Sequence, residues 1–408
     1  MIRHPAVLRT SVTTRREFFA RLAIGAGAGL LGCSSSTDIP GPPTPADSGL
    51  DHIVVVTMEN RSFDHLLGWL PAAEARQAGL SYLNRDGLSR QTHHLEDFQG
   101  CAFVDPSHSF AGGRTAYNNG LCDGWLRAEN NDEYAIGYYE AADLAFFGQA
   151  APQWTVLDRY FAPFLGPTYP NRLIMQAGQT DRIENTLVAS TLPTIWDKLG
   201  AAGLTGLNYG SSFVSATLFG TRYTSLIRPI TSFIADAAAG TLPSVALVDP
   251  DFSADVSDSY HPPGDIRDGE AFLSRIYHAV TTSPAWRKTL LIITFDEWGG
   301  FFDHVPPPAA PIPSGERDVG NVDGLRGFRV PTLLISPFAA RRRTSSVVYD
   351  HASILGLIEW RWGLQPLSVR DAGANNLAAE LDFSAPLLTA PVIDVPAGPY
   401  GATCPVAA

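Results

Sequence analysis

The sequence predicts a single α/β domain of three layers, in which helices cover both faces of a mostly parallel sheet. Three observations lead to this prediction. Uninterrupted apolar runs rich in β-branched residues recur along the chain, which is typical of strands that are buried on both faces. Helical patterns lie between or after these runs, and the sequence shows no internal repeat. Alternation of this kind builds a layered domain around a parallel sheet.

The expected strands are five apolar runs of this type. They cover residues 52–58, 154–157, 244–248, 289–295 and 330–336. Helices are expected over residues 269–280 and 353–362, where apolar residues repeat at helical spacing, and we interpret both apolar stripes as core packing. In sheets of this type, sites form beyond the carboxyl ends of the strands. The polar residues that follow the strands are therefore the candidates for chemistry.

The composition is that of a folded, acidic protein. Of the 408 residues, 45% are hydrophobic and 17% are charged, which excludes a disordered chain. The 29 Lys and Arg residues are outnumbered by 41 Asp and Glu residues, and the net charge is −12. Because a phosphate backbone selects basic surfaces, nucleic acid is not an expected partner.

The N-terminal residues have the features of an export signal. Arg15 and Arg16 precede an apolar stretch over residues 20–31, and this arrangement resembles a twin-arginine signal. The stretch leads to Cys33 in a sequence that resembles a bacterial lipobox. The alternatives are a soluble N-terminal helix or a membrane anchor, but the stretch is shorter than the ~20 residues that span a bilayer. We therefore expect residues 1–32 to be a signal peptide, and the protein to be an exported cell-envelope lipoprotein attached to the membrane through lipidated Cys33.

A tether and one folded domain are expected to follow. Residues 33–49 are small, polar and rich in proline, so they cannot bury enough apolar surface to fold. The folded domain, residues 50–408, contains Cys101, Cys122 and Cys404. In an oxidising compartment Cys101 and Cys122 could close a local loop, or Cys404 could pair with either of them. The odd number leaves at least one thiol free.

Polar side chains follow two of the predicted strands. Glu59 and Asn60 come directly after the first strand and could offer oxygen ligands to a divalent cation, or Asn60 could instead cap a helix. Asp296 and Glu297 come directly after the fourth strand, and a Gly-Gly turn and His304 follow them. Adjacent carboxylates repel each other unless a positive group lies between them, and a metal ion is the simplest such group. These strand ends therefore predict a metal site.

A hydroxyl group and three histidines complete the candidate residues. Thr168 follows Gly-Pro just ahead of an expected helix, where the helix dipole and free N–H groups favour an alkoxide and bind phosphate. A threonine nucleophile needs such activation, although Thr168 could also be an ordinary N-cap. His108, His261 and His351 lie in polar motifs. Apart from His304, the remaining histidines, His65 included, are interpreted as ordinary surface or core residues.

Seven segments of the sequence together resemble bacterial phosphoesterases of the phospholipase C and acid phosphatase type. They occur in the order of that family between about residues 52 and 364, and they read HIVVVTMENRSFDHLLG, DPSH, AYNNGLCDGW, GPTYPNR, HPPGDIRDGEAFLSRIYHAV, TFDEWGGFFDHVPPP and YDHASILGLIEWRWG. The resemblance implies an alkaline-phosphatase-like α/β/α fold, with residues 50–408 as the phosphoesterase catalytic domain.

The resemblance also implies the composition of the site. One divalent metal ion is expected to be held by Glu59, Asn60, Thr168, Asp296 and Glu297. His108, His261 and His304 are expected to surround the phosphate, with His304 as the general acid and the role of His351 open. Mostly oxygen ligands favour a hard cation such as Mn²⁺, Mg²⁺ or Ca²⁺, and Zn²⁺ also remains a candidate. Coordination would lower the pKa of Thr168 and make it the nucleophile.

Three functions are compatible with these residues. The favoured one is a phospholipase C-like phosphodiesterase, which acts on a phospholipid or another phosphate ester. The alternatives are a phosphomonoesterase with broad substrates and a catalytically silent surface lipoprotein. Aromatic residues near the motifs could cage a choline-type cation or simply pack in the core. They are Trp125, Tyr138, Tyr139, Trp298, Phe301 and Phe302.

Overall fold

A computed structural model describes residues 44–253, 257–401 and 404 of the chain. The strands of its main sheet are β1 (His52–Met58), β6 (Thr155–Leu157), β7 (Gly206–Tyr209), β8 (Ile227–Arg228), β9 (Val245–Val248), β10 (Thr289–Phe295), β11 (Leu333–Ile335) and β12 (Arg343–Ser345). Their order in the sheet is β12-β6-β11-β10-β1-β9-β7-β8. All five predicted apolar runs contain a strand, and β1 and β10 have the predicted bounds. The sequence analysis missed β7, β8 and β12, which are short.

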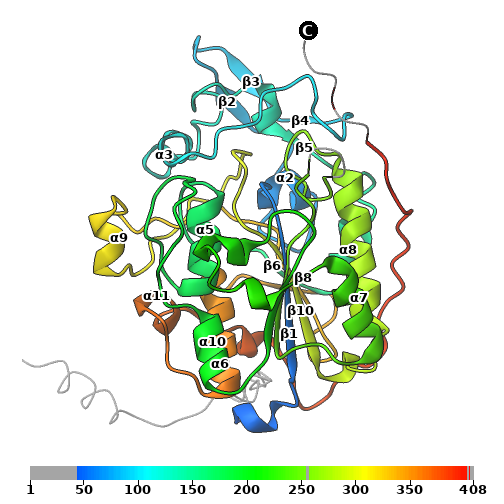
Figure 1. Ribbon diagram of the computed structural model, residues 1–408. Helices are drawn as coiled ribbons and strands as arrows, with labels where there is room; N and C mark the ends of the chain where they lie inside the picture. The colour runs from blue at the N-terminus through cyan, green and yellow to red at the C-terminus, as the bar shows by residue number, and fades with distance from the viewer. Residues whose placement is uncertain (1–43, 254–256, 402–403, 405–408) are drawn as a thin grey trace, which may run out of the picture. The chain divides into compact units, whose positions relative to one another are not determined.

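The α-helices are α2 (Phe63–Leu67), α3 (Phe110–Tyr117), α4 (Phe147–Ala150), α5 (Thr168–Ala177), α6 (Ile195–Ala201), α7 (Ile230–Ala239), α8 (Ile266–Thr281), α9 (Ser314–Asp318), α10 (His351–Trp362) and α11 (Val369–Ala372). Helices α5, α6 and α10 lie on one side of the sheet, and α7 and α8 lie on the other (Figure 1). The domain therefore has the three layers that the sequence predicts. Both predicted helices, α8 and α10, are present.

The central strands are parallel, and one strand of the sheet runs against them. Strand β1 lies between β10 and β9 and pairs in parallel with both. Strand β11 is antiparallel to β10 and to β6. The sheet is thus mostly parallel, as predicted, with this exception. Strands β1 and β10 pair along their whole length, from His52 opposite Thr289 to Met58 opposite Phe295, so both strands end at the same edge of the sheet.

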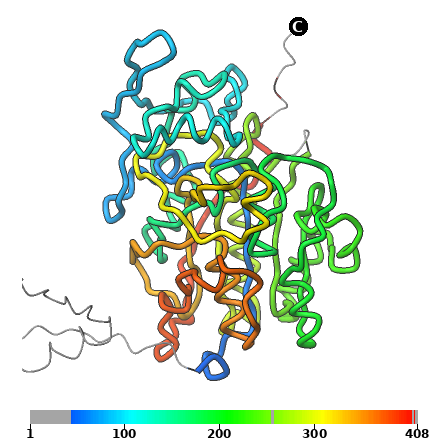
Figure 2. The backbone as a smooth tube through the Cα atoms, turned by 90° about the vertical axis from the view of Figure 1, so that its left-hand side faces the viewer, coloured from blue at the N-terminus to red at the C-terminus, as the bar shows by residue number. Residues whose placement is uncertain are grey.

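A smaller region lies above that edge of the sheet (Figures 1 and 2). It contains α3, the antiparallel pair of β2 (Ser81–Leu83) and β3 (Ser89–Gln91), and the parallel pair of β4 (His93–His94) and β5 (Gly137–Tyr138). Short 3-10 helices complete the described chain: η1 (Pro45–Ser48), η2 (Asn118–Gly120), η3 (Glu133–Ile136), η4 (Ser215–Phe219), η5 (Thr224–Leu226), η6 (Trp286–Lys288) and η7 (Leu377–Glu380).

The N-terminal boundary and the cysteine pairing are also visible. Ser48 of η1 is buried, so the folded domain begins a few residues before the expected start at residue 50. Cys101 and Cys404 form a disulfide, while Cys122 is a free, buried thiol. Cys101 therefore pairs with the distant Cys404 and does not close the local loop with Cys122. The expected signal peptide and Cys33 lie outside the described residues. No helix within the described ranges combines the length and the apolar character needed to cross a bilayer.

Candidate active site

Three neighbouring strands each end in a carboxylate at the same edge of the sheet. Glu59 follows β1, Asp296 and Glu297 follow β10, and Asp249 follows β9. All four side chains are buried. The sequence analysis predicted the first three and missed Asp249, although the same signal, an apolar strand that runs directly into an acid, was present. Parallel pairing brings these carboxylates together because the strands leave the sheet side by side.

A buried guanidinium group lies among these carboxylates. Arg172, on α5, forms ion pairs of 2.6 Å with Glu59, 2.7 Å with Asp249 and 3.2 Å with Asp296. Burial would lower the pKa of Arg172, but the carboxylates outweigh it and raise that pKa. The arginine is therefore charged at any physiological pH, and it fixes the orientation of three acids.

One guanidinium group does not neutralise four carboxylates. Burial and then the charge of Glu59 raise the pKa of Asp296 well above its usual value. Burial, together with Glu59 and Asp105, does the same to the pKa of Glu297. Burial also opposes ionisation of Glu59, but Arg172 and then His261 lower the pKa of Glu59 below its usual value. A divalent cation beside Glu59, Asp296 and Glu297 would remove this repulsion, so the donor set fits a metal ion.

Asn60 supports the same conclusion through its side-chain amide. One terminal atom of the amide lies beside Glu297 Oε1 and 3.3 Å from Glu59 Oε1, and the other lies 3.1 Å from His261 Nε2. With its nitrogen toward the carboxylates, the amide donates hydrogen bonds to them. With its oxygen toward them, the amide oxygen of Asn60 faces the carboxylate oxygens of Glu59 and Glu297. Three acceptors in this arrangement are favourable around a cation. The other interpretation, Asn60 as a helix cap, is wrong because Ser62 caps α2.

Thr168 is the first residue of α5 and faces the carboxylates. Its hydroxyl group donates a 2.9 Å hydrogen bond to Glu59 Oε1, and 6% of the residue is exposed. The N-cap of α5 is Pro167, so Thr168 is not the cap, and its hydroxyl group is free for another task. The helix that the sequence predicts after Thr168, over residues 171–176, is therefore longer in the structure and includes Thr168 itself. Helix α5 thus supplies both this hydroxyl and, one turn later, the guanidinium of Arg172.

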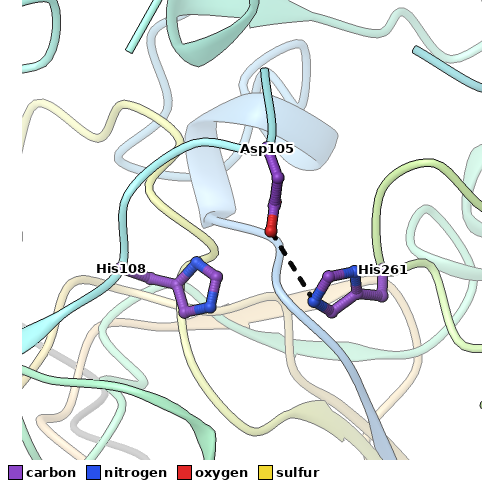
Figure 3. A group of neighbouring side chains, drawn as sticks. All are labelled: Asp105, His108 and His261. Atoms are coloured by element: carbon purple, nitrogen blue, oxygen red, sulfur yellow. Dashed lines mark ion pairs between the residues drawn. The ribbon is translucent and has the colours of Figure 1, made fainter. Parts of the chain in front are cut away.

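Two histidines and an aspartate lie beside the carboxylates (Figure 3). His261 Nε2 is 3.8 Å from Asp105 Oδ2, and His108 Nε2 is 4.0 Å from Glu297 Oε1. The Nδ1 atom of His108 lies within hydrogen-bond distance of the carbonyl group of Pro106, and that of His261 lies within hydrogen-bond distance of the carbonyl group of Pro262. With Nδ1 donating to a carbonyl, each Nε2 faces the site as an acceptor when neutral and as a donor when protonated. The three side chains could therefore hold a metal ion or bind an anion.

A surface cavity of 350 Å³ opens beside these groups. Pro167 and His108 are part of its wall, so it lies next to Thr168. Asp105, Glu129 and Glu184 also line it. The cavity thus borders one of the two site histidines and the residue that precedes Thr168.

The structure does not bring His304 to this site, and the role of general acid expected for it is not supported. His304 Nδ1 lies 2.5 Å from Asp64, and Asp64 and Asp303 form ion pairs with Arg329. Among the described residues, no polar contact links His304 to Thr168 or Glu297. Burial would lower the pKa of His304, but Asp64 outweighs it and raises that pKa. Arg329 and His304 thus pair with the two acids, and Asp64, Asp303 and His304 are also close enough together to form a second candidate metal-binding group.

A Gly-Gly turn explains the separation of His304 from Glu297. Gly299 and Gly300 have φ values of +63° and +73°, which favour glycine. A Cβ atom on Gly299 would lie 2.1 Å from the carbonyl oxygen of Asn60, and one on Gly300 would lie 2.6 Å from the backbone of Pro106. The turn packs against both site segments and then directs the chain into the core, so His304 emerges elsewhere.

His351 holds the backbone of a candidate metal ligand. It is fully buried, with Nε2 2.9 Å from the carbonyl oxygen of Asp296 and Nδ1 3.0 Å from the hydroxyl group of Tyr160. Burial lowers the pKa of His351 to about 4, so the ring is neutral at physiological pH. The structure thus gives His351 a positioning contact to Asp296. His65 is also fully buried and neutral, because burial and Arg61 lower its pKa, so it is a core residue as expected.

The aromatic residues that could have caged a cation are core residues instead. None of the six is more than 9% exposed. Their rings pack against other rings, as Trp125 and Trp298 do against Phe328. The structure therefore favours core packing over a choline cage.

The fold and this polar cluster define the chain as a layered α/β protein with a buried polar site at the carboxyl edge of its sheet. The profile of the Phosphoesterase family matches residues 50–365, and the chain belongs to that family. It is 30% identical to Non-specific phospholipase C6 of Arabidopsis thaliana, over 86% of this chain and 74% of that protein. It is 29% identical to Phospholipase C B of Mycobacterium tuberculosis, over 91% of this chain and 86% of that protein.

A third relative and one solved structure complete the comparison. Non-hemolytic phospholipase C of Pseudomonas aeruginosa is 28% identical, over 83% of this chain and 58% of that protein. A protein in the alkaline phosphatase superfamily from Vibrio parahaemolyticus aligns with a TM-score of 0.40 and 9% identity, over 82% of this chain and 72% of that one. The family match confirms the predicted resemblance, and the chain is a hydrolase that acts on phosphate esters.

Proposed function

We propose that the chain is a metal-dependent phosphodiesterase of the phospholipase C type with Thr168 as its nucleophile. The observation that carries this proposal is the hydrogen bond from the hydroxyl group of Thr168 to Glu59 within a buried, negatively charged cluster. The metal would be held by Glu59, Asn60, Thr168, Asp296 and Glu297, whose oxygen atoms fit a hard divalent cation. When bound, the ion supplies positive charge that favours the threonine alkoxide and the developing phosphoryl charge.

The first half of the reaction transfers the phosphoryl group to the enzyme. Oγ1 of Thr168 attacks phosphorus, and its proton passes to the carboxylate of Glu59, which already accepts it as a hydrogen bond. As the Oγ1–P bond forms, the bond from phosphorus to the alcohol oxygen breaks. His261, protonated at Nε2 and facing Asp105, gives its proton to the leaving alcohol. His108 donates to a phosphoryl oxygen. His261 replaces His304 as the general acid.

The second half releases the phosphate ester. His261, now neutral, takes a proton from water as that water attacks phosphorus. The Oγ1–P bond breaks, and Thr168 recovers its proton from Glu59. For a phosphatidylcholine substrate, the products are diacylglycerol from the first half and phosphocholine from the second. Arg172 keeps Glu59 and Asp296 in place throughout.

The substrate proposal rests on the relatives, which are named phospholipases C. We expect the purified enzyme to release phosphocholine from phosphatidylcholine faster than it releases phosphate from an aryl phosphate monoester. Asp296→Ala, which removes a metal ligand, is the inactive control, and its metal content by elemental analysis should fall. The reverse preference would identify a phosphomonoesterase. No hydrolysis of either substrate by the metal-loaded enzyme would refute the proposed function.

A further inference from the structure

A long C-terminal segment, residues 385–401, lies along the domain without forming a helix or strand. We call it the C-terminal strap. It runs alongside α8 toward the smaller region above the sheet, in red in Figure 1. Its backbone carbonyl groups accept hydrogen bonds from Trp286, Tyr277 and His278 along the way. The strap is therefore attached at several points along its length.

The upper end of the strap is attached at the start of α8. The backbone N–H groups of Tyr400 and Gly401 donate to Asp268, at 2.9 Å and 3.3 Å. The ring of Tyr400 also packs against the guanidinium group of Arg267, 5.0 Å from the ring centroid. Helix α8 begins at Ile266, shortly after His261. The strap thus ends against the segment that carries one of the two site histidines.

The disulfide then connects the end of the strap to the other site segment. Cys404 Sγ lies 3.9 Å from the carbonyl oxygen of Pro263, two residues after His261. Its partner Cys101 lies four residues before Asp105 and seven before His108. Asp105 and His261 face each other across the gap between the segments, 3.8 Å apart (Figure 3). The covalent bond therefore ties Cys404, which lies beside the His261 segment, to the segment that carries Asp105 and His108.

The segment from Cys101 to His108 is held at its far end, where Pro106 is buried and His108 Nε2 lies 3.4 Å from the side-chain amide of Asn60. The backbone N–H groups of Val104 and Ser107 donate to Asp132 and Asn131, and the ring of Phe103 stacks on Tyr134. Residues 101 to 105 are all exposed, so burial contributes little to holding them. A surface segment of this kind samples several conformations unless it is fixed at both ends.

We infer that the Cys101–Cys404 disulfide is a positioning device for catalysis, which holds Asp105 and His108 against His261. The inference rests on the proposed function, because it assumes that His261 and His108 act on the substrate. Misplacement of a catalytic group by about 1 Å can cost about 100-fold in rate. Loss of the disulfide should therefore reduce activity in the folded enzyme, in addition to any effect on stability.

The test compares the oxidised enzyme with Cys101→Ser/Cys404→Ser, at a temperature where both are fully folded by near-UV circular dichroism. We expect kcat/KM for a soluble phosphodiester to fall by about tenfold or more in the double variant, mainly through kcat. Reduction of the wild type should cause the same fall, reoxidation should reverse it, and the double variant should not respond to reductant.

Two matched controls separate positioning from stability and from other thiol chemistry. Tyr277→Phe removes the hydrogen bond to Pro391 and loosens the strap far from the site, so it should lower Tm without changing kcat/KM. Cys122→Ala should respond to reductant as the wild type does. Burial raises the pKa of the Cys122 thiol to about 12, so it stays protonated.

A loss of less than about fivefold in the folded double variant, or an equal loss in Tyr277→Phe, would overturn the inference. This outcome differs from failure of the proposed function. If the proposed function fails, the oxidised wild type itself does not hydrolyse the soluble phosphodiester.

Discussion

At the scale of single residues, Arg172 determines how the site is built. It is buried with three carboxylates, and it is the charged partner that keeps Glu59 and Asp296 oriented. Buried ion pairs add little net stability, but removal of one partner leaves an uncompensated charge. The role of Arg172 is therefore to place the oxygen atoms that the proposed metal and Thr168 require.

Arg172→Lys tests this role because it keeps the charge and loses the planar fork. We expect kcat to fall by about tenfold or more, together with a loss of about 1–3 kcal/mol in the free energy of unfolding. Arg329→Lys is the matched control, since Arg329 is equally buried and pairs with Asp64 and Asp303 away from the site. It should lose similar stability and keep its kcat. Equal loss of kcat in both variants would contradict the assignment.

At the scale of elements, the sequence predicted what local patterns determine. Strands β1 and β10 have continuous apolar runs, so they and the acids after them could be predicted, as could helices α8 and α10. Strands β8 and β12 are two and three residues long, too short for a pattern to show. Their places depend on tertiary pairing.

Long-range contacts explain the parts of the site that were missed. Arg172 was part of a recognised motif, but nothing local shows that three strand ends meet around it. His304 follows Glu297 closely in sequence, but it pairs with Asp64, and no local pattern indicates that contact. Asp249 could have been predicted from the strand before it. The pairing of Cys101 depends on where residues 385–401 lie, which no local pattern indicates.

Helices α10 and α11 meet at a pair of carboxyl groups that makes stability depend on pH. The backbone N–H of Leu367 donates to both Glu359 and Asp371. Burial and then Asp371 raise the pKa of Glu359 to about 9, from 4.5 in an unfolded chain. A raised carboxyl pKa means that the folded state binds the extra proton between these values. The free energy of unfolding therefore decreases as pH rises from about 4.5 toward 9.

Glu359→Gln removes this titration and keeps the shape of the protonated acid. We expect the variant to match the wild type near pH 4.5 and to exceed it by about 2 kcal/mol near pH 9, as measured by urea unfolding. Glu316→Gln is the contrasting control, because it takes the partner from buried Arg370 and should destabilise the protein at neutral pH. If the free energies of unfolding of Glu359→Gln and the wild type differ by a constant amount across this pH range, the raised pKa of Glu359 is refuted.

At the scale of the whole molecule, we propose that the enzyme is exported folded and held at a membrane by lipid on Cys33. The twin-arginine sequence and the lipobox motivate the proposal. Replacement of Arg15 and Arg16 by Lys should retain precursor in the cytoplasm, as followed by cell fractionation. Cys33→Ala should abolish acylation and leave export intact. Normal export of the Lys-Lys variant would show that the twin-arginine assignment is wrong.

Thr168 is the residue on which the proposed chemistry depends. If its hydroxyl group only supports the fold through the hydrogen bond to Glu59, Thr168→Ala should cost about 1 kcal/mol and leave catalysis largely intact. As the nucleophile, Thr168 predicts a folded variant whose activity is lower by several orders of magnitude. Thr168→Ser keeps a hydroxyl group and should retain measurable turnover.

Acid quenching during turnover of phosphatidylcholine, followed by mass spectrometry of the peptide that contains Thr168, tests the nucleophile most directly. We predict a phosphocholine adduct on Thr168 in the wild type, an adduct on the serine of Thr168→Ser, and none in Thr168→Ala. The proposed mechanism is contradicted if Thr168→Ala retains more than about a tenth of wild-type kcat/KM, a loss of less than ~1.4 kcal/mol in transition-state stabilisation, because the nucleophile then lies elsewhere.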